Sequence, residues 1–594
     1  LCRPEELYRG IAYFAGKYGE LTGKPIISAA ICDVPGYTWG VVPMMGQAGI
    51  KYFAIAPNYS DRIGRVHAVW DDKPFYWISP SGMEKILCWI TGHYWKHGNL
   101  ENEVLAHLKK RQRSDYPYSL EWMYWIATRD NGQCDNSPPD TNLSAAVEDW
   151  NQKYLAPKLI IGTSKEFFPK FEKRYGDQLP EYRGDMTPYW EDGAGSTSAE
   201  TGMNRRSADK LSQAETLWAI LAPEKRPAEK LEEAWKNVLL YSEHTWGAYC
   251  SISNPDDPFT VSQWERKRQF ALDAAAQAES LLKEAVAEAD FDSEKENKEN
   301  GFSVWNTTQW VRTELVKVPA ELAEEGDFVL DAAGERQLSQ RLSNGDLVFL
   351  AREVPPLKGK NYFVSSKLAE NMENGPECMP LQVKEEGKII SDKVELSLDT
   401  VTGAIRELRF TGEEHNFVDP DAPVGLNDYR YLKGVDPSKA QVNGQVKIEI
   451  AESGPLVGAL RVSSAAPGCV ELIREIRLVS GSPRVEIINF VNREVVREKD
   501  AVHIGFGFNI PNGQLRMETP WAVVRPNYDQ LPGSCYNWYT VQRWVDISNR
   551  DIGILWGSVD APLMEIGGLT ANLLGSVSLD EWMNLAYESQ TLYS

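Results

Sequence analysis

One aspartate stands where α/β proteins place ligand-binding or catalytic groups. The apolar run 26–32 is typical of a buried strand, and it ends at Asp33, just before a Pro-Gly pair. A helical stretch, 38–47, and a second apolar strand, 50–56, follow and predict a βαβ unit. Ligands bind at the carboxyl ends of strands in such units. A carboxylate buried there needs a metal or hydrogen bonds, so an active-site role and a helix cap are the two hypotheses for Asp33.

Two later segments carry groups that could act together with this aspartate. Segment 184–197, GDMTPYWEDGAGST, contains Asp185, Glu191 and Asp192, and an aromatic loop after a helical stretch contains His244. Aspartate and histidine both bind zinc directly. Two carboxylates in different environments are what glycoside hydrolysis needs, one ionised and one protonated. The alternatives are a solvated turn for the acids and a helix-terminal or core role for the histidine.

Composition narrows the classes of function. At 594 residues the chain is too long for a single core, and its net charge of −22 argues against nucleic acid and anionic membrane surfaces as partners. No apolar run is long enough to span a bilayer. The 20 tryptophans are typical of clefts where sugar rings stack on aromatic faces, although most of them are expected in the core.

The chain falls into three parts by its periodicity. Residues 1–198 alternate short apolar strands with helices and predict a mostly parallel α/β domain. Residues 199–300 predict a three-helix bundle and end in a charged linker, and residues 301–594 predict a large antiparallel β-sandwich. The helices expected in the bundle are 199–222, 227–242 and 262–290.

Further elements are expected within the α/β part. Apolar runs predict strands at 85–90, 122–128 and 158–162. Helical periodicity predicts helices at 143–154 and 163–175, the second with a capping residue at its start.

Four stretches, in this order, resemble the family 38 glycoside hydrolases, the α-mannosidase family. ICDVPGYTWGVVPMMGQAGIKYFAIAPN resembles the nucleophile segment of that family. GDMTPYWEDGAGSTSAETGMNRRSADKLSQAE, YSEHTWGAYCSIS and FSVWNTTQWVRTELVKV follow with suitable spacing, and the resemblance continues through residues 522–549. The sequence looks closest to a divergent bacterial branch. The resemblance implies that the α/β part is related to a (β/α) barrel, of which this chain carries a portion.

The resemblance implies a retaining mechanism on a zinc ion. Asp33 would be both a zinc ligand and the nucleophile, and His244 would be a second ligand. The metal would contact two adjacent sugar hydroxyls in a cis arrangement, as in mannose. The acid/base carboxylate would come from 184–197, with Asp192 and Glu191 as candidates and Asp185 less favoured.

Residues that would contact the sugar are assigned on the same basis. Arg129 and Asp130 follow a predicted strand and would bind sugar hydroxyls. The expected platforms for sugar rings are Trp39, Tyr189, Trp190 and Trp246.

One feature of the family pattern is missing. The family carries a His-x-Asp motif on its first barrel strand, and none of the seven histidines here is followed two residues later by aspartate. The chain is therefore expected to begin inside the catalytic domain, truncated at its N-terminus. Asp33 and His244 alone give two protein ligands, whereas catalytic zinc usually has three, so weak zinc binding and poor hydrolysis are expected.

Two other functions stay open. One is a catalytically incomplete carbohydrate-binding protein, and the other is a different metal-dependent sugar hydrolase such as a deacetylase, which would need neither the helical bundle nor the long β region. The expected partner is an oligosaccharide or glycan, and the oligomeric state is open. The eight cysteines lack a CxxC pair and are typical of free buried thiols, with disulfides as the alternative. The sequence opens at Leu1 with no methionine and no signal-like segment, so the compartment stays open, with a cytoplasmic location favoured over a secreted one.

Overall fold

The computed structural model describes most of the chain. The described residues are 2–32, 34, 36–57, 66–70, 72–91, 99–112, 116–123, 140–187, 190–244, 250–251, 253–289, 301–366, 381–434, 436–536, 538–567 and 590–594. Within 190–193 the backbone is described and the side chains are not. Five residues predicted for the site lie outside this description: Asp33, Arg129, Asp130, Tyr189 and Trp246.

The N-terminal part is built on one mixed sheet with strand order β1-β2-β4-β3-β5. Strands β1, β2 and β4 are parallel to one another, whereas β3 runs antiparallel to β4 and β5 runs parallel to β3. The strands are β1 (Ser28–Cys32), β2 (Tyr52–Ala56), β3 (Pro74–Ile78), β4 (Lys85–Ile90) and β5 (Glu181–Arg183). In the described part of the chain this sheet is open and does not close into a barrel.

The βαβ unit predicted around Asp33 is confirmed by β1, α3 and β2, and the strand predicted at 85–90 is β4. The predicted mostly parallel sheet is confirmed, because three of its four strand pairings are parallel. The antiparallel pairing of β3 with β4 was not predicted. The strand predicted at 158–162 was wrong. Those residues form no strand, and Ile160 is 86% exposed. An apolar run of this length has no strand identity without a partner strand. Trp122 and Met123 are not in a strand, and the rest of 122–128 lies outside the description.

Helices precede this sheet and connect or follow its strands. They are α1 (Pro4–Tyr8), the π-helical turn η1 (Arg9–Tyr13), α2 (Phe14–Thr22), α3 (Val41–Gln47), α4 (Val66–Trp70), α5 (Leu100–Arg111), α6 (Leu143–Lys153), α7 (Ser164–Tyr175) and the short turn η2 (Gly176–Gln178). Thr163 and Glu166 form a reciprocal capping box that starts α7, as the sequence predicted. Phe168 and Phe171 of α7 then pack on Trp89 of β4, and this contact holds α7 against one face of the sheet.

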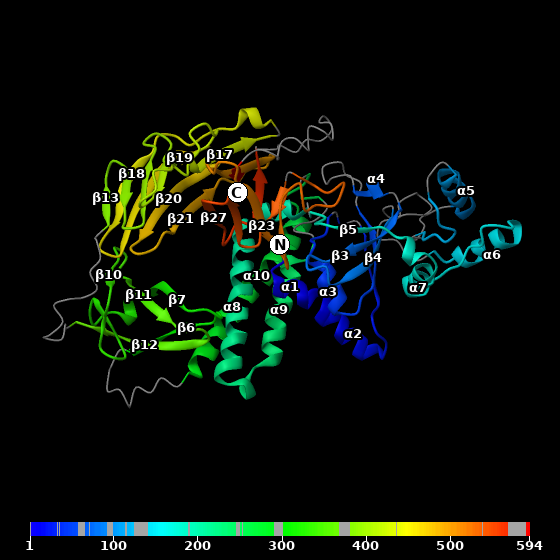
Figure 1. The fold of residues 1–594 in the computed structure, drawn as a ribbon, viewed down its shortest axis with the longest axis horizontal. Coiled ribbons are helices and arrows are strands. Elements are labelled where there is room, and N and C mark those ends of the chain that lie inside the picture. The colour runs from blue at the N-terminus through cyan, green and yellow to red at the C-terminus, as the bar shows by residue number, and fades with distance from the viewer. Residues whose placement is uncertain are drawn as a thin grey trace.

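Three long helices follow, close to their predicted bounds. They are α8 (Ser198–Leu221), α9 (Ala228–Ser242) and α10 (Pro258–Ala287), with the turns η3 (Trp190–Thr197) before α8 and η4 (Pro223–Lys225) after it. Trp218, Trp235 and Leu281, one from each helix, lie in a shared core. In Figure 1 these helices stand between the N-terminal sheet and the β region, and α5, α6 and α7 lie at the far side of the N-terminal part.

The remainder is antiparallel β structure arranged, among the described residues, in five sheets, the largest with nine strands. It also holds the turns η5 (Ala320–Leu322) and η6 (Pro437–Lys439). The strands are β6 (Gly301–Asn306), β7 (Arg312–Val318), β8 (Phe328–Asp331), β9 (Arg336–Gln337), β10 (Ser339–Arg341), β11 (Leu347–Val354), β12 (Lys358–Ser365), β13 (Gln382–Lys384), β14 (Lys388–Ile390), β15 (Val394–Leu398), β16 (Ile405–Phe410), β17 (Leu426–Lys433), β18 (Lys447–Ser453), β19 (Val457–Ala466), β20 (Cys469–Val479), β21 (Val485–Arg493), β22 (Asp500–Gly507), β23 (Gln514–Thr519), β24 (Ala522–Val524), β25 (Trp538–Thr540), β26 (Trp544–Ser548), β27 (Gly553–Gly557), β28 (Leu563–Ile566) and β29 (Thr591–Tyr593).

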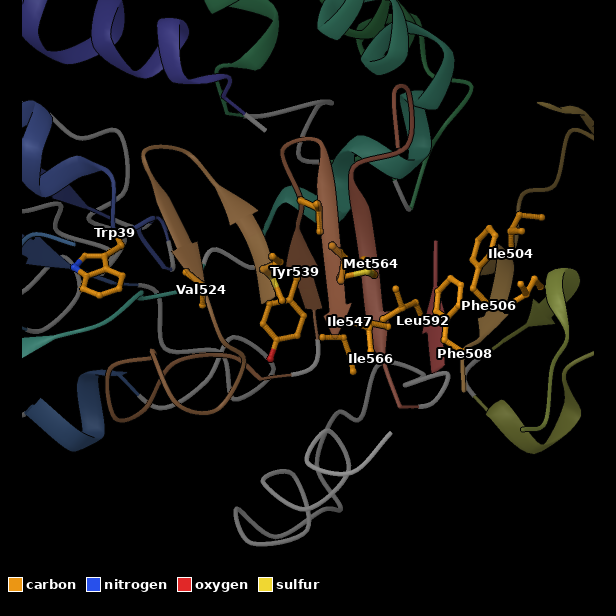
Figure 2. Packing of buried hydrophobic residues seen from close by; sticks show 14 of the residues in the cluster. Trp39, Ile504, Phe506, Phe508, Val524, Tyr539, Ile547, Met564, Ile566 and Leu592 are labelled. Carbon is orange, nitrogen blue, oxygen red and sulfur yellow. The ribbon is translucent and has the colours of Figure 1, made fainter. Parts of the chain in front are cut away.

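The largest hydrophobic core joins the two ends of the chain. It contains Trp39 and Phe53 from the N-terminal part together with Val524, Phe506 and Leu592 from the β region. Figure 2 shows Trp39 at one side of this core, with Val524, Tyr539, Met564 and Phe506 following across the strands. The N-terminal sheet and the β region therefore share buried surface and fix each other's position. Among the described residues, no helix combines the length and apolarity that a membrane span needs.

Candidate active site

The carboxyl ends of β1, β2 and β4 form one edge of the N-terminal sheet. Cys32 pairs with Ala56 and Ile55 pairs with Ile90, so the three parallel strands end at the same level. The amide of Thr91 donates to the Ile55 carbonyl at 2.7 Å just beyond this edge. The predicted nucleophile, Asp33, lies outside the described residues, and it follows Cys32 directly in the sequence. Its expected place after a strand of this edge is therefore consistent with the course of the chain.

The loop after β1 is bound to the start of the acidic segment. The amide of Tyr37 donates to the Met186 carbonyl at 2.6 Å, and the amide of Met186 donates back to Tyr37 at 3.2 Å. The backbone amide of Trp39 donates to Oδ1 of Asp185 at 2.7 Å. The segment that carries the predicted acid/base residue thus begins beside the loop that follows the predicted nucleophile.

Asp185, the less favoured acid candidate, is buried and hydrogen-bonded to two other segments of the chain. It is 2% exposed, and its carboxylate accepts the Trp39 amide. Its own amide donates to the Asp529 carbonyl at 2.7 Å, and its carbonyl accepts the Leu531 amide at 2.8 Å. These bonds join three distant segments and give Asp185 a structural role.

Trp39 is placed differently from its prediction as a ring platform. Its side chain lies in the core and is 6% exposed, and its indole N–H donates to the Ile78 carbonyl at 2.8 Å. Because the side chain is buried in the core, it offers no exposed surface for a sugar ring, and the platform role for Trp39 is corrected to a core role.

The acidic turn η3 carries Trp190, Glu191 and Asp192, whose side chains lie outside the description. The end of this turn is bonded to α9. Tyr241 of α9 donates from its hydroxyl to the Thr197 carbonyl at 3.2 Å, and the same hydroxyl is 2.9 Å from the hydroxyl oxygens of Thr197 and Thr201. Tyr241 is 1% exposed. Burial raises its pKa, while hydrogen bonds from the threonine hydroxyls act in the other direction, so it stays a neutral hydroxyl.

His244, the predicted second zinc ligand, lies just beyond the end of α9 and is exposed. Two residues before it, the Ser242 hydroxyl donates to Oε1 of Glu6 at 2.9 Å. Glu6 belongs to α1 and is 2% exposed, and burial raises its pKa against the opposing effect of the Arg3 amide and Ser242. Next to Glu6, Leu7 packs against the chain at Gly40, which follows the loop after β1. Helix α1 therefore lies between the two segments that are predicted to supply zinc ligands.

The donor set fits zinc in kind. An exposed imidazole at a fixed helix end and a carboxylate after a strand are ligands that zinc accepts. Among the described residues, no group of three or more His, Cys, Asp or Glu side chains gathers as a metal site, and His244 is the only predicted ligand within them. No ligand geometry is therefore derived.

The β region supplies contacts that the sequence did not indicate. The Gln530 side-chain amide donates to the Thr187 hydroxyl at 2.5 Å and to the Cys535 carbonyl at 2.8 Å. Leu563 of β28 packs against Gly195 of η3. The stretch 522–549 was singled out only by its resemblance to the family. In the structure its residues 529–535 contact and hold the segment that leads into η3.

Comparisons with known proteins agree with this arrangement. Residues 6–185 match the family model described as the N-terminal domain of the family 38 glycosyl hydrolases. The fold is similar to the crystal structure of an α-mannosidase from Enterococcus faecalis V583, with a TM-score of 0.68 and 14% sequence identity over 100% of this chain and 72% of that chain. No curated protein gives a significant match. The predicted resemblance to this family is confirmed by the match over residues 6–185, and the predicted enzyme class, a glycosidase, is that of the matched family.

Proposed function

We propose that this protein is an α-mannosidase-like retaining glycosidase that uses zinc and cleaves terminal α-linked sugars from glycans. The match over residues 6–185 supports the glycosidase class, and the fold shared with an α-mannosidase supports the choice within that class. The zinc ion, the retaining course and the sugar are the parts that the experiments below test.

One observation carries the proposal. The three segments predicted to supply the chemistry are tied together, the loop after β1 to Asp185 and Met186, and η3 to the end of α9. These segments are far apart in the sequence. If they were unrelated surface loops, they would not be expected to lie together. Their meeting favours a catalytic site over a binding module that has lost one.

In the proposed reaction, the Asp33 carboxylate attacks the anomeric carbon while the bond from that carbon to the leaving oxygen breaks. Glu191 or Asp192 gives its proton to the leaving oxygen, and a covalent glycosyl-enzyme ester forms on Asp33. Water then attacks the anomeric carbon, the same acidic residue accepts the proton of this water as general base, and Asp33 is released as carboxylate. Two inversions at one carbon retain the configuration.

Asp33 and His244 are the residues of this chain that would hold the zinc ion, which when bound would contact two adjacent sugar hydroxyls and favour a distorted ring. Buried groups nearby fix the frame in which these residues act. Asp185 holds the loop after β1, and Tyr241 holds η3 against α9. Two protein ligands predict weaker zinc binding than a site with three.

The proposal is tested with the full-length protein on a panel of aryl glycosides. We expect turnover of the aryl α-mannoside, release of the α-anomer first as seen by proton NMR, and loss of turnover on dialysis against a chelator with recovery on adding zinc. Release of the β-anomer would refute the retaining course, and turnover unaffected by chelator would refute the metal. An inactive protein that still binds mannosides would support the binding-module alternative.

A further inference from the structure

The end of α9 is held by residues from four other helices or turns. Tyr241 is bonded to Thr197 and Thr201, Ser242 to Glu6, and the carbonyl groups at the end of the helix to Lys267 of α10. His244 follows at once. These contacts therefore fix the position of the backbone that leads into His244.

Lys267 has the environment of a helix cap. Its ammonium group donates to the carbonyls of Leu240, at 2.8 Å, and of Glu243, and it is 3.2 Å from Oε2 of Glu243. The last carbonyl groups of a helix have no partner within the helix and carry the negative end of its dipole, so a cation there is favourable. Lys267 is 7% exposed, and burial lowers its pKa against the effect of Glu243. A buried ammonium group is tolerated only when its N–H groups donate hydrogen bonds, and here the acceptors are backbone carbonyls of the segment that leads to His244.

The chain changes direction at this point. Glu243 has extended backbone angles, φ −64° and ψ 143°, and its amide closes the last helical hydrogen bond to the Leu239 carbonyl at 2.9 Å. The carbonyl of Glu243 is the first one outside the helix and lies in the peptide bond to His244. By binding this carbonyl and that of Leu240 together, one ammonium group fixes the exit angle of the chain.

We propose that Lys267 is a positioning residue that fixes His244 relative to the acidic turn η3, through its bonds to the two carbonyl groups that end α9. The proposal rests on the proposed function for the meaning of His244, but the clamp itself can be tested without it. Tyr241 completes the frame, because its hydroxyl ties the same helix end to η3.

The test compares Lys267→Met with a matched control, Lys210→Met. Lys210 lies on α8, pairs with Glu279 of α10 and is far more exposed, so the control removes a lysine–glutamate pair from the same helices without touching the end of α9. Lys267→Arg keeps donors for both carbonyl groups, and Glu243→Gln removes the ion pair while leaving the two backbone bonds. The readouts are hydrogen–deuterium exchange of peptides spanning the end of α9, zinc affinity by competition titration, and kcat and KM.

We expect Lys267→Met to raise exchange at the end of α9 and to weaken zinc binding about tenfold, with a fall in kcat and little change in KM. Lys210→Met and Glu243→Gln should leave exchange there and zinc affinity within about twofold, and Lys267→Arg should recover most of the loss. Equal exchange in Lys267→Met and Lys210→Met would overturn the inference, even if both lose thermal stability. If the exchange result holds but neither wild type nor His244→Ala binds zinc, the clamp stands and the proposed function fails.

Discussion

At the scale of single residues, the proposed function depends most on Asp33, which has two proposed roles. Asp33→Ala removes both a nucleophile and a zinc ligand, so we expect hydrolysis of an aryl α-mannoside to fall by several orders of magnitude. The fold should persist, because the neighbouring loop is held through Tyr37 and Trp39. Initial rates and far-UV circular dichroism measure the two effects. A variant that kept most of the activity would show that another residue is the nucleophile.

The choice of acid/base residue is decided by leaving-group dependence. Glu191→Gln and Asp192→Asn each remove one proton donor from η3 without changing side-chain length. The variant of the true acid should lose activity on poor leaving groups and keep much of it on activated aryl groups, because these leave without protonation. The other variant should lose activity equally on both classes. If both variants lose activity equally on activated and on poor leaving groups, the acid lies outside η3.

The sequence ranked the acid candidates in an order that agrees with the structure, but it could not predict which side chains are buried. Asp185 was ranked below Glu191 and Asp192, and its bonds to Trp39 and Leu531 agree with a structural role. Trp39 has the same side chain whether it lies in a cleft or in a core, and only the packed structure separates the two cases. Nothing in the sequence around Lys267 distinguishes this buried lysine from the exposed Lys283 on the same helix.

At the scale of elements, Glu6 joins α1 to the end of α9 and makes this junction sensitive to pH. Because the pKa of Glu6 is raised in the folded protein, the folded state holds this proton more tightly than the unfolded chain. The resulting stabilisation is present below the ordinary glutamate pKa and is lost as pH rises through the raised pKa. Glu6→Gln removes this titration and keeps an oxygen that accepts from Ser242.

The stability of Glu6→Gln relative to wild type should therefore increase as pH rises, by about 1 kcal/mol per unit over the range in which Glu6 ionises. Urea denaturation of both proteins, at about pH 5 and about pH 8, measures the difference while other titrations cancel. Glu232→Gln is the control, because Glu232 is largely exposed and pairs with Lys17. A constant difference between Glu6→Gln and wild type at both pH values would contradict a raised pKa.

Elements with long periodic patterns were predicted closely, and short apolar runs were not. The helices α8, α9 and α10 are long enough for their periodicity to identify them. β3 and the run 158–162 are both short and mainly apolar, each with five residues, and the difference lies in the partner strand. Strand β3 pairs with β4, which follows it after residues 79–84, whereas 158–162 has no strand beside it in the described residues.

At the scale of the whole molecule, the β region is part of the support of the site. Backbone pairing of Asp185 with 529–531 joins residues more than three hundred positions apart, and the largest core contains side chains from both regions. Sequence periodicity reports on neighbours along the chain and cannot predict which distant loops pair. The resemblance of 522–549 to the family marked this stretch without saying what it touches.

This coupling predicts the effect of one methyl group at Gly40. A Cβ there would lie 2.0 Å from the Pro520 carbonyl oxygen, a backbone atom that cannot rotate away as a flexible side chain could. Gly40→Ala should therefore separate the N-terminal part from the β region and lower the free energy of unfolding by about 1–3 kcal/mol. Gly16→Ala is the matched control, because a Cβ at Gly16 in α2 meets no atom within 4 Å. There the added methyl should leave stability unchanged or raise it by up to about 1 kcal/mol.

Calorimetry of the two variants distinguishes a shared core from independent parts. If the N-terminal part and the β region unfold together, Gly40→Ala should shift the whole transition to lower temperature. It should also reduce glycosidase activity, since Trp39, whose amide is held by Asp185, directly precedes Gly40. If they unfold separately, the variant should split the transition and shift only its first part. A Gly40→Ala protein as stable as Gly16→Ala would mean that this contact with Pro520 does not hold the two parts together in solution.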